Sequence, residues 1–313
     1  MACIFAVAND LKAQWSKGVR DPLLASRVLA LLLEDRSVRT RLAFESAMIQ
    51  LGGRSIVLGS ETGFRTRETP ADFCRVLSQF VDIVVVRAAR HGAVLQVARH
   101  CTCPVINGGS DRAFLCQALA DLFTLHEALG PLDGKTLVFL GQRGPLARSL
   151  AEGCARTGMH FIMAAAPASQ LEPEFVSNLR SAFPCSAIEM TAEAEDAVRR
   201  ASAVYDGGWT SARQGAGGRP VSGTSPSYRL TAKLLLHAPR DVFRMHNLRM
   251  DRRLAVPGEL FDHPQSLISA QLANRLHVVK GLLVWLLGTQ LAPVQTSAQL
   301  QSDESPQLRV RGR

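Results

Sequence analysis

The stretch Glu34-Asp35-Arg36-Ser37-Val38-Arg39-Thr40-Arg41 carries the clearest information about the fold. It follows the apolar run Val28–Leu33, which is typical of a buried strand, and leads into Thr40–Leu51, whose apolar spacing is typical of a helix. Ser37 stands where a helix N-cap belongs, and the first amide groups of a helix have no partners within it. A strand-to-helix turn with hydroxyls and arginines therefore indicates a phosphate or carboxylate site. A capped helix with a solvated basic first turn would show the same pattern.

Short apolar runs and helical segments alternate on both sides of this turn. Further strands are expected at Ser55–Leu58, Ile83–Arg87, Val105–Asn107, Thr136–Gly141, His160–Ala165, Ala203–Asp206 and Val242–His246. Further helices are expected at Pro70–Phe80, Ala93–His100, Arg112–Leu129, Leu146–Thr157, Glu172–Phe183 and Leu272–Leu287. This alternation predicts an α/β fold with two domains, each a parallel sheet flanked by helices.

The segment Gly130–Lys135 has the Gly, Pro and Asp content of a linker, and a length of 313 residues agrees with two modest domains. We expect one domain over residues 1–130, completed by the C-terminal helix 272–288, and a second over residues 131–271. Two stretches are expected to lack regular structure. They are the Gly-, Ser- and Arg-rich loop 207–228 and the tail 289–313.

Composition excludes several broad classes of protein. With 47% apolar and 20% charged residues the chain resembles an ordinary globular protein, and its longest apolar runs are far shorter than a membrane span. The first residues lack the pattern of a signal peptide, and the seven cysteines are scattered, so we expect a cytoplasmic protein with reduced thiols. The net charge of +9 is spread along the chain and only 6% of residues are aromatic, which favours an anionic small molecule over nucleic acid.

Two further motifs resemble parts of a cofactor site or a metal site. Gly141-Gln142-Arg143-Gly144 before a helix is similar to a dinucleotide-binding turn, but the following strand ends without the carboxylate that would hold a ribose. His100-Cys101-Thr102-Cys103 has no second pair at zinc-like spacing. Neither a nucleotide cofactor nor a metal is therefore predicted.

Several motifs in order are similar to those of one enzyme family. Ser37-Val38-Arg39-Thr40-Arg41 resembles the Ser-Thr-Arg-Thr-Arg signature of the aspartate/ornithine carbamoyltransferase family. Later motifs of the family are matched by Arg87, Val105–Gly108 with Cys116–Leu122, Met245–Leu248, and Asn274-Arg275 with Val284–Leu287. The likeness runs from about Leu11 to Gly288 and is closest to the ornithine branch.

The resemblance implies an enzyme in which an amine attacks the carbonyl of carbamoyl phosphate and phosphate leaves, with no cofactor. It implies a carbamoyl-phosphate-binding first domain, an amino-acid-binding second domain, an ornithine-like acceptor, and a cytoplasmic homotrimer in amino-acid biosynthesis. By the same resemblance the catalytic residues are Arg87, Gln117 and Arg275. Substrate binding is assigned to Ser37, Val38, Arg39, Thr40, Arg41, Asp206, Ser211, Asn247 and Leu248.

Several positions depart from the family pattern. Phe114-Leu115 stands where the family has His-Pro, and losing such a donor to the carbonyl oxygen typically costs about 10²–10³ in rate. Gly207 stands at the position of an Asp that holds the amino acid, and Asn247 replaces a Cys that contacts the substrate. Two interpretations stay open on this basis. The chain is either an active transferase, with the same or an altered acceptor, or a decayed paralogue that binds a phosphate-bearing ligand or a partner subunit.

Overall fold

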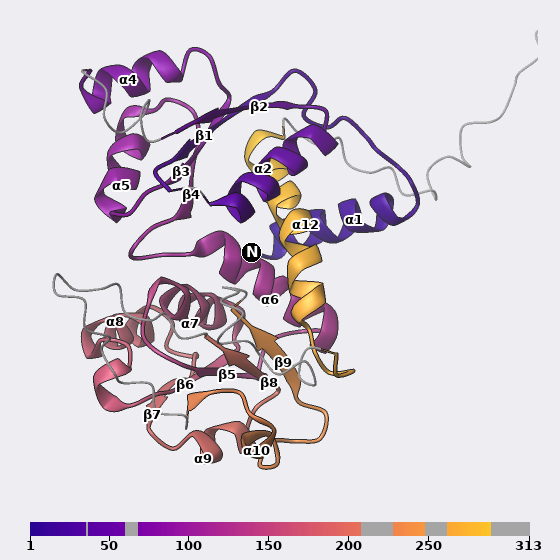
Figure 1. Cartoon of the computed structure of the whole chain (residues 1–313), viewed down its shortest axis with the longest axis vertical. Helices are drawn as coiled ribbons and strands as arrows, with labels where there is room; N and C mark the ends of the chain where they lie inside the picture. Colours follow the sequence, from indigo (N-terminus) through magenta and orange to yellow (C-terminus); the bar gives the residue numbers. More distant parts are fainter. Residues whose placement is uncertain (36, 60–67, 208–227, 248–261, 289–313) are drawn as a thin grey trace, which may run out of the picture.

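The computed structural model describes residues 1–35, 37–59, 68–207, 228–247 and 262–288. They form two parallel sheets flanked by helices, as the sequence predicts, with the first sheet above the second in Figure 1. Nearly all of the expected loop 207–228 and the whole expected tail 289–313 lie outside the described residues.

The first sheet has the strand order β2-β1-β3-β4. Its strands are β1 (Val28–Leu33), β2 (Arg54–Leu58), β3 (Ile83–Arg87) and β4 (Val105–Gly109), and its helices are α2 (Val38–Gln50), α4 (Pro70–Leu77) and α5 (His91–His100). Side chains of a strand alternate between the faces of a sheet. Leu29 and Leu31 accordingly join the cluster that contains Phe44 of α2, whereas Ala30 and Leu32 pack with α4 and α5 on the opposite face. Both faces of β1 are covered, which explains its uninterrupted apolar sequence.

The second sheet has the strand order β7-β6-β5-β8-β9. Its strands are β5 (Thr136–Leu140), β6 (His160–Ala164), β7 (Ile188–Thr191), β8 (Ala203–Asp206) and β9 (Phe243–His246). Its helices are α7 (Pro145–Thr157), α8 (Pro173–Ala182), α9 (Ala194–Arg199) and α10 (Ala232–Leu235), and a 3₁₀ helix spans Pro167–Ser169.

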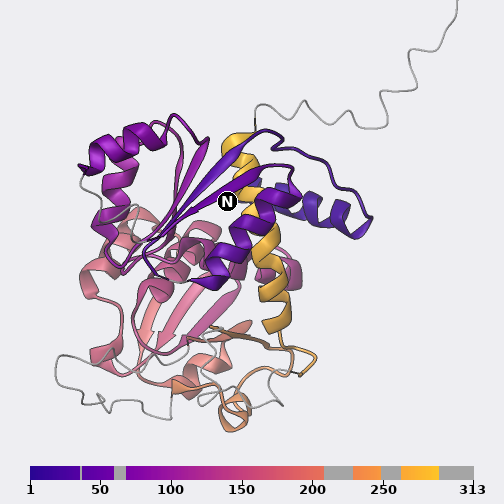
Figure 2. The same cartoon turned by 45° about the horizontal axis from the view of Figure 1, so that its top comes forward.

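Three long helices contribute side chains to the cores of both sheets. They are α1 (Ala2–Ser16), α6 (Leu115–Leu129) and α12 (Ile268–Leu287). In both ribbon views α12 runs beside α1 and α2 and extends toward the second sheet, where it contacts β9 (Figure 1 and Figure 2). Gly281 permits the close approach of α1, since a Cβ there would lie 2.8 Å from the carbonyl oxygen of Ile4. None of the helices within the described ranges is long and apolar enough to cross a membrane.

Each expected strand is present, with its ends displaced by at most two residues. The four-residue edge strand β7 and the helices α1, α9 and α10 were not predicted from the sequence. Two expected helix starts were wrong. Helix α6 begins at Leu115 rather than Arg112, because the amide of Ala113 bonds to Ser110 Oγ at 3.3 Å in a turn before the helix, and α12 begins at Ile268.

Candidate functional site

The candidate site begins at the carboxyl ends of the first sheet's strands, the edge where open α/β sheets place their ligands. Strands β1 and β3 are joined there, since the amide of Glu34 donates to the carbonyl oxygen of Arg87 at 2.9 Å. The turn after β1 is closed by the amide of Ser37, which donates to the carbonyl oxygen of Asp35 at 2.8 Å. These bonds bring the start of α2 and the side chain of Arg87 to one edge.

Ser37 is the N-cap residue of α2, as the sequence predicts, but its side chain does not cap the helix. Its hydroxyl donates instead to Thr40 Oγ1 at 2.9 Å, and Thr40 is buried. Ser37 therefore leaves the first amides of α2 to other acceptors, as at a helix end that receives an anion.

Arg87 is fixed on three sides. Its Nε and Nη2 donate to the two carboxylate oxygens of Asp35 at 2.7 and 3.1 Å, and Nη1 donates to the carbonyl oxygen of Gly108 at 3.3 Å. The guanidinium carbon lies 5.5 Å from the centre of the Phe114 ring, within the range of a cation–π contact. The aromatic ring that stands in place of the family's histidine thus packs against this arginine.

Gln117 and Arg275 are joined directly, although they lie on different helices. Arg275 Nη1 donates to Gln117 Oε1 at 2.8 Å. Burial is the main cause that lowers the pKa of Arg275, and the positive charges of Arg39 and Arg87 lower it further. Arg39 and Arg87 therefore both act electrostatically on Arg275, and such a concentration of positive charge favours a ligand with more than one negative charge.

A buried carboxylate supports Gln117. Asp121 Oδ1 accepts hydrogen bonds from Gln117 Nε2 and from Gln271 Nε2, each at 2.8 Å, and Oδ2 accepts one from the Tyr205 hydroxyl at 2.8 Å. Burial raises the pKa of Asp121 to about 6, although the three hydrogen bonds oppose the shift. This role of Asp121 and Tyr205 was not predicted from the sequence. The only local signal is the spacing of Gln117 and Asp121, four residues apart on one helix face.

The expected amino-acid side of the site lies where β8 and β9 end. Asp206 is buried and its carboxylate accepts a hydrogen bond from the amide of Leu230 at 3.1 Å. Asn247 Nδ2 donates to the carbonyl oxygen of Gly207 at 2.9 Å, which ties the two strand ends together. The amide of His246 donates to Gln271 Oε1 at 3.1 Å, so Gln271 links this edge to Asp121.

The remaining predicted site residues differ in their exposure and in their contacts. Val38 is 65% exposed on α2. Arg41 forms an ion pair with Glu45 one turn along the same helix, at 2.7 Å. Ser211 and Leu248 lie outside the described residues.

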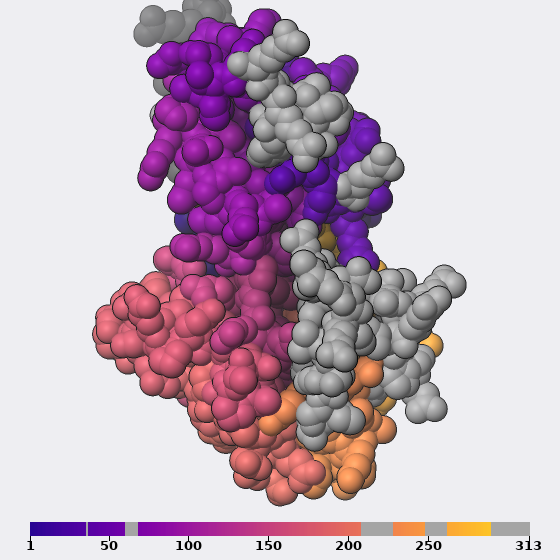
Figure 3. All heavy atoms as spheres, turned by 60° about the vertical axis from the view of Figure 1, so that its left-hand side comes forward, coloured from indigo at the N-terminus to yellow at the C-terminus, as the bar shows by residue number. Residues whose placement is uncertain are grey.

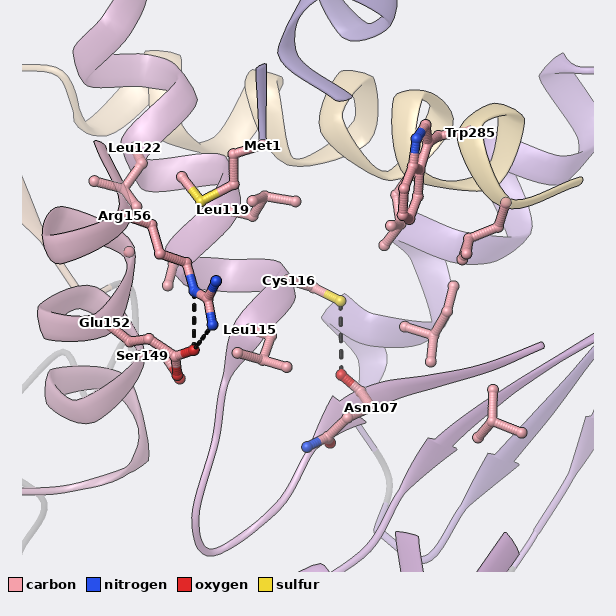
Figure 4. Close-up of a pocket in the computed structure, with 16 residues that line it drawn as sticks. Met1, Asn107, Leu115, Cys116, Leu119, Leu122, Ser149, Glu152, Arg156 and Trp285 are labelled. Atoms are coloured by element: carbon pink, nitrogen blue, oxygen red, sulfur yellow. Dashed lines mark hydrogen bonds and ion pairs between the residues drawn. The ribbon is translucent and has the colours of Figure 1, made fainter. Parts of the chain in front are cut away.

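An apolar cavity of about 540 Å³ lies beside α6 and is lined by other residues (Figure 4). Leu115, Cys116 and Leu119 of α6 face Trp285 of α12 across it, and none of the predicted site residues lines it. The thiol of Cys116 donates to the carbonyl oxygen of Asn107 at 3.7 Å, and burial raises its pKa to about 11. Such a thiol is a poor nucleophile at neutral pH, and Cys116 instead packs in the core around Phe44.

In the space-filling view the residues of the two sheets form an upper and a lower lobe that meet at a waist (Figure 3). Helix α6 crosses this level, and Asp121 joins it to both β8 and α12. Fold and site together define a two-sheet α/β protein that gathers guanidinium groups where its sheets approach each other, an arrangement suited to a small anionic substrate.

Comparison with known proteins identifies the family. Residues 1–127 match the carbamoyl-P binding domain of aspartate/ornithine carbamoyltransferase, and residues 133–286 match its Asp/Orn binding domain. The chain belongs to the aspartate/ornithine carbamoyltransferase family. It is 36% identical to ornithine carbamoyltransferase of Rhizobium meliloti (strain 1021) over 282 residues, which are 90% of this chain and 92% of that protein.

A further relative and a solved structure carry the same name, ornithine carbamoyltransferase. The chain is 37% identical to ornithine carbamoyltransferase of Rhodopseudomonas palustris (strain ATCC BAA-98 / CGA009) over 286 residues, with 90% of each protein covered. The structure of ornithine carbamoyltransferase from Pyrococcus furiosus aligns with a TM-score of 0.85 at 30% identity, over 92% of this chain and 93% of that one.

Proposed function

We propose that this chain transfers the carbamoyl group of carbamoyl phosphate to the amine of ornithine or a closely similar amino acid and releases phosphate. The observation that carries the proposal is the hydrogen bond between Arg275 and Gln117, beside which the positive charges of Arg39 and Arg87 lower the pKa of Arg275. The names of the two relatives from Rhizobium meliloti and Rhodopseudomonas palustris support ornithine as the acceptor. No feature of the described residues favours the decayed paralogue.

The first requirement of the reaction is to hold a phosphate group and stabilise it as it leaves. Ser37, Arg39, Thr40 and Arg87 are proposed to do this, with the backbone of Val38 at the start of α2 and the charge of Arg41 nearby. Guanidinium groups bind phosphate with paired, charge-assisted hydrogen bonds, and helix amides add further donors. Arg87 is already held by the carbonyl oxygen of Gly108, and a guanidinium that the fold holds in place stabilises the departing charge with little movement of its own.

The second requirement is to polarise and align the carbamoyl group. Gln117 and Arg275 are proposed to bind it together with the backbone carbonyl of Leu248. The bond between Gln117 and Arg275 fixes one side chain against the other. Asp121 would act through Gln117 as a positioning residue, because its carboxylate accepts a hydrogen bond from Gln117 Nε2.

The third requirement is to present the amine. Asp206, Asn247 and Ser211 are proposed to bind the amino acid at the ends of β8 and β9. Tyr205 precedes Asp206 on β8 and bonds to Asp121 four residues after Gln117, so the two halves of the proposed site share one buried carboxylate. Residues 131–271 would then form the amino-acid-binding domain. Residues 1–130 with the helix 272–288 would form the carbamoyl-phosphate-binding domain.

We further propose a cytoplasmic homotrimer that acts in amino-acid biosynthesis. Helix α2 supports the association of copies, since Val38, Leu42 and Ile49 are 65%, 58% and 65% exposed and are spaced to share one face. Ile56 of the edge strand β2 is also exposed. Exposed apolar side chains gathered in this way are typical of subunit contacts.

The test is the formation of a ureido product from carbamoyl phosphate with a panel of amines that includes ornithine, lysine and aspartate. We expect product with ornithine or a close homologue, and its loss in an Arg87→Ala variant that remains folded. The absence of product with every amine, from a folded protein that binds carbamoyl phosphate in calorimetry, would overturn the proposal in favour of a binding protein.

A further inference from the structure

The edge of Arg87 that would grip a phosphate is already occupied by a carboxylate. Nε and Nη2 form the paired edge with which a guanidinium binds two oxygens of an anion. Both donate to Asp35, at 2.7 and 3.1 Å. A phosphate that takes this edge must therefore replace Asp35.

Of the two partners, Arg87 is the one that the fold holds in place. Its side chain is 19% exposed, and Nη1 is bonded to the carbonyl oxygen of Gly108. The backbone of Gly109 packs so closely that a Cβ there would lie within 2.4 Å of Nη1, and the Phe114 ring lies over the guanidinium. The side chain of Asp35 is 60% exposed, in the turn between β1 and α2. Asp35 is thus the partner that can turn into solvent.

We propose that Asp35 is an internal counter-anion that carbamoyl phosphate displaces from Arg87 and that returns to Arg87 as phosphate leaves. The inference rests on the proposed function of this site. A phosphate dianion carries more charge than the carboxylate and would contact Arg39 and Arg275 as well as Arg87, whereas Arg87 is the one cation among the described residues with which Asp35 forms an ion pair. Once the carbamoyl group has been transferred, the carboxylate of Asp35 pairs with Arg87 again, which favours phosphate release and limits inhibition by this product.

Neutralising Asp35 should change the affinity for phosphate in opposite directions, depending on whether Asp35 competes with phosphate or only orients Arg87. If Asp35 competes with phosphate, its neutralisation tightens phosphate binding. Exposed ion pairs are worth little, so we expect a gain in affinity of about fivefold. If Asp35 served only to orient Arg87, its neutralisation would loosen the guanidinium and weaken phosphate binding.

The experiment is calorimetric titration of the full chain with inorganic phosphate, for the wild type and for Asp35→Asn, Asp35→Ala and Asp35→Glu. We expect about fivefold tighter binding in the two neutral variants and near wild-type affinity in Asp35→Glu, which keeps the carboxylate. Asp10→Asn is the control for net charge, because Asp10 is an exposed residue of α1, and its affinity should stay near the wild-type value. Two neutral variants are used so that the misfolding of one does not decide the result.

Steady-state kinetics of the same variants separates this inference from the proposed function. We expect the inhibition constant of phosphate and the KM for carbamoyl phosphate to fall together in Asp35→Asn. If ureido product forms but neutral variants bind phosphate no more tightly than the wild type, the role of Asp35 is overturned and the function stands. If neutral variants bind phosphate more tightly but no amine is carbamoylated, the exchange at Arg87 stands and the function is overturned. Absence of phosphate binding in every protein overturns the role of Asp35.

Discussion

Tyr205, on the second sheet, donates its hydroxyl hydrogen to Asp121 of helix α6 at 2.8 Å, and both side chains are fully buried. Asp121 also accepts hydrogen bonds from Gln117 and Gln271. One carboxylate therefore connects the second sheet, α12 and the side chain proposed to touch the carbamoyl group. Its protonation state should affect stability and catalysis in opposite directions.

The first prediction concerns the pH dependence of stability. Burial raises the pKa of Asp121 from its ordinary value of 3.8 to about 6, so the folded protein binds this proton more tightly than the unfolded chain. The stabilisation from that proton is fully present below pH 3.8 and is lost as the pH rises through about 6. Its size is on the order of 3 kcal/mol. The measurement is urea denaturation of the wild type and Asp121→Asn at pH 4.5 and pH 7.5.

Because Asn resembles the protonated acid in shape and lack of charge, the wild type should lose free energy of unfolding relative to the variant as the pH rises. A constant difference between the two proteins at both pH values would contradict the shifted pKa of Asp121. Tyr205→Phe serves as a companion variant, since it removes one donor to the carboxylate and should raise the pKa of Asp121 further.

The second prediction concerns the pH dependence of catalysis. Ionised Asp121 accepts its hydrogen bonds as a charged group, whereas protonation removes the charge that strengthens the bond from Gln117, which loosens Gln117 and with it Arg275. We expect kcat to fall as the pH drops through about 6. Asp121→Asn should lack this acidic limb and should keep a low, flat kcat at every pH. An acidic limb near pH 6 that persists in Asp121→Asn would assign the titration to another group.

Most of the fold could be predicted from the sequence, because strands buried on both faces are continuous apolar runs. The edge strand β7, Ile188–Thr191, escaped notice because its four residues include a glutamate and give no such run. The arginines of the proposed phosphate site were foreseen from motifs. Their partners were not, since Asp35 is 52 residues from Arg87 and Asp121 is 84 residues from Tyr205. Contacts between such distant segments depend on strand order, which local patterns do not contain.

The third prediction concerns the contact between α1 and α12. A Cβ at Gly281 would lie 2.8 Å from the carbonyl oxygen of Ile4 and 3.0 Å from the amide nitrogen of Ala8, so the two helices must separate to admit it. We expect Gly281→Ala to lower the free energy of unfolding by about 1–3 kcal/mol. The matched control is Gly92→Ala in α5, where an added Cβ meets nothing within 4 Å. That variant should be neutral or stabilised by up to about 1 kcal/mol in the same denaturation experiment.

The last prediction is that two arginines in the same turn of α2 contribute unequally to phosphate binding. Arg39 acts electrostatically on Arg275, whereas Arg41 is paired with Glu45 at 2.7 Å and is 55% exposed. Hydrogen bonds to charged groups contribute about 1.5–3 kcal/mol, so Arg39→Ala should weaken phosphate binding by about tenfold or more. Arg41→Ala should weaken it by no more than about threefold, because an exposed and already paired charge acts weakly at a distance. Calorimetry with inorganic phosphate measures both variants, and equal affinities of Arg39→Ala and the wild type would show that the phosphate site is misassigned.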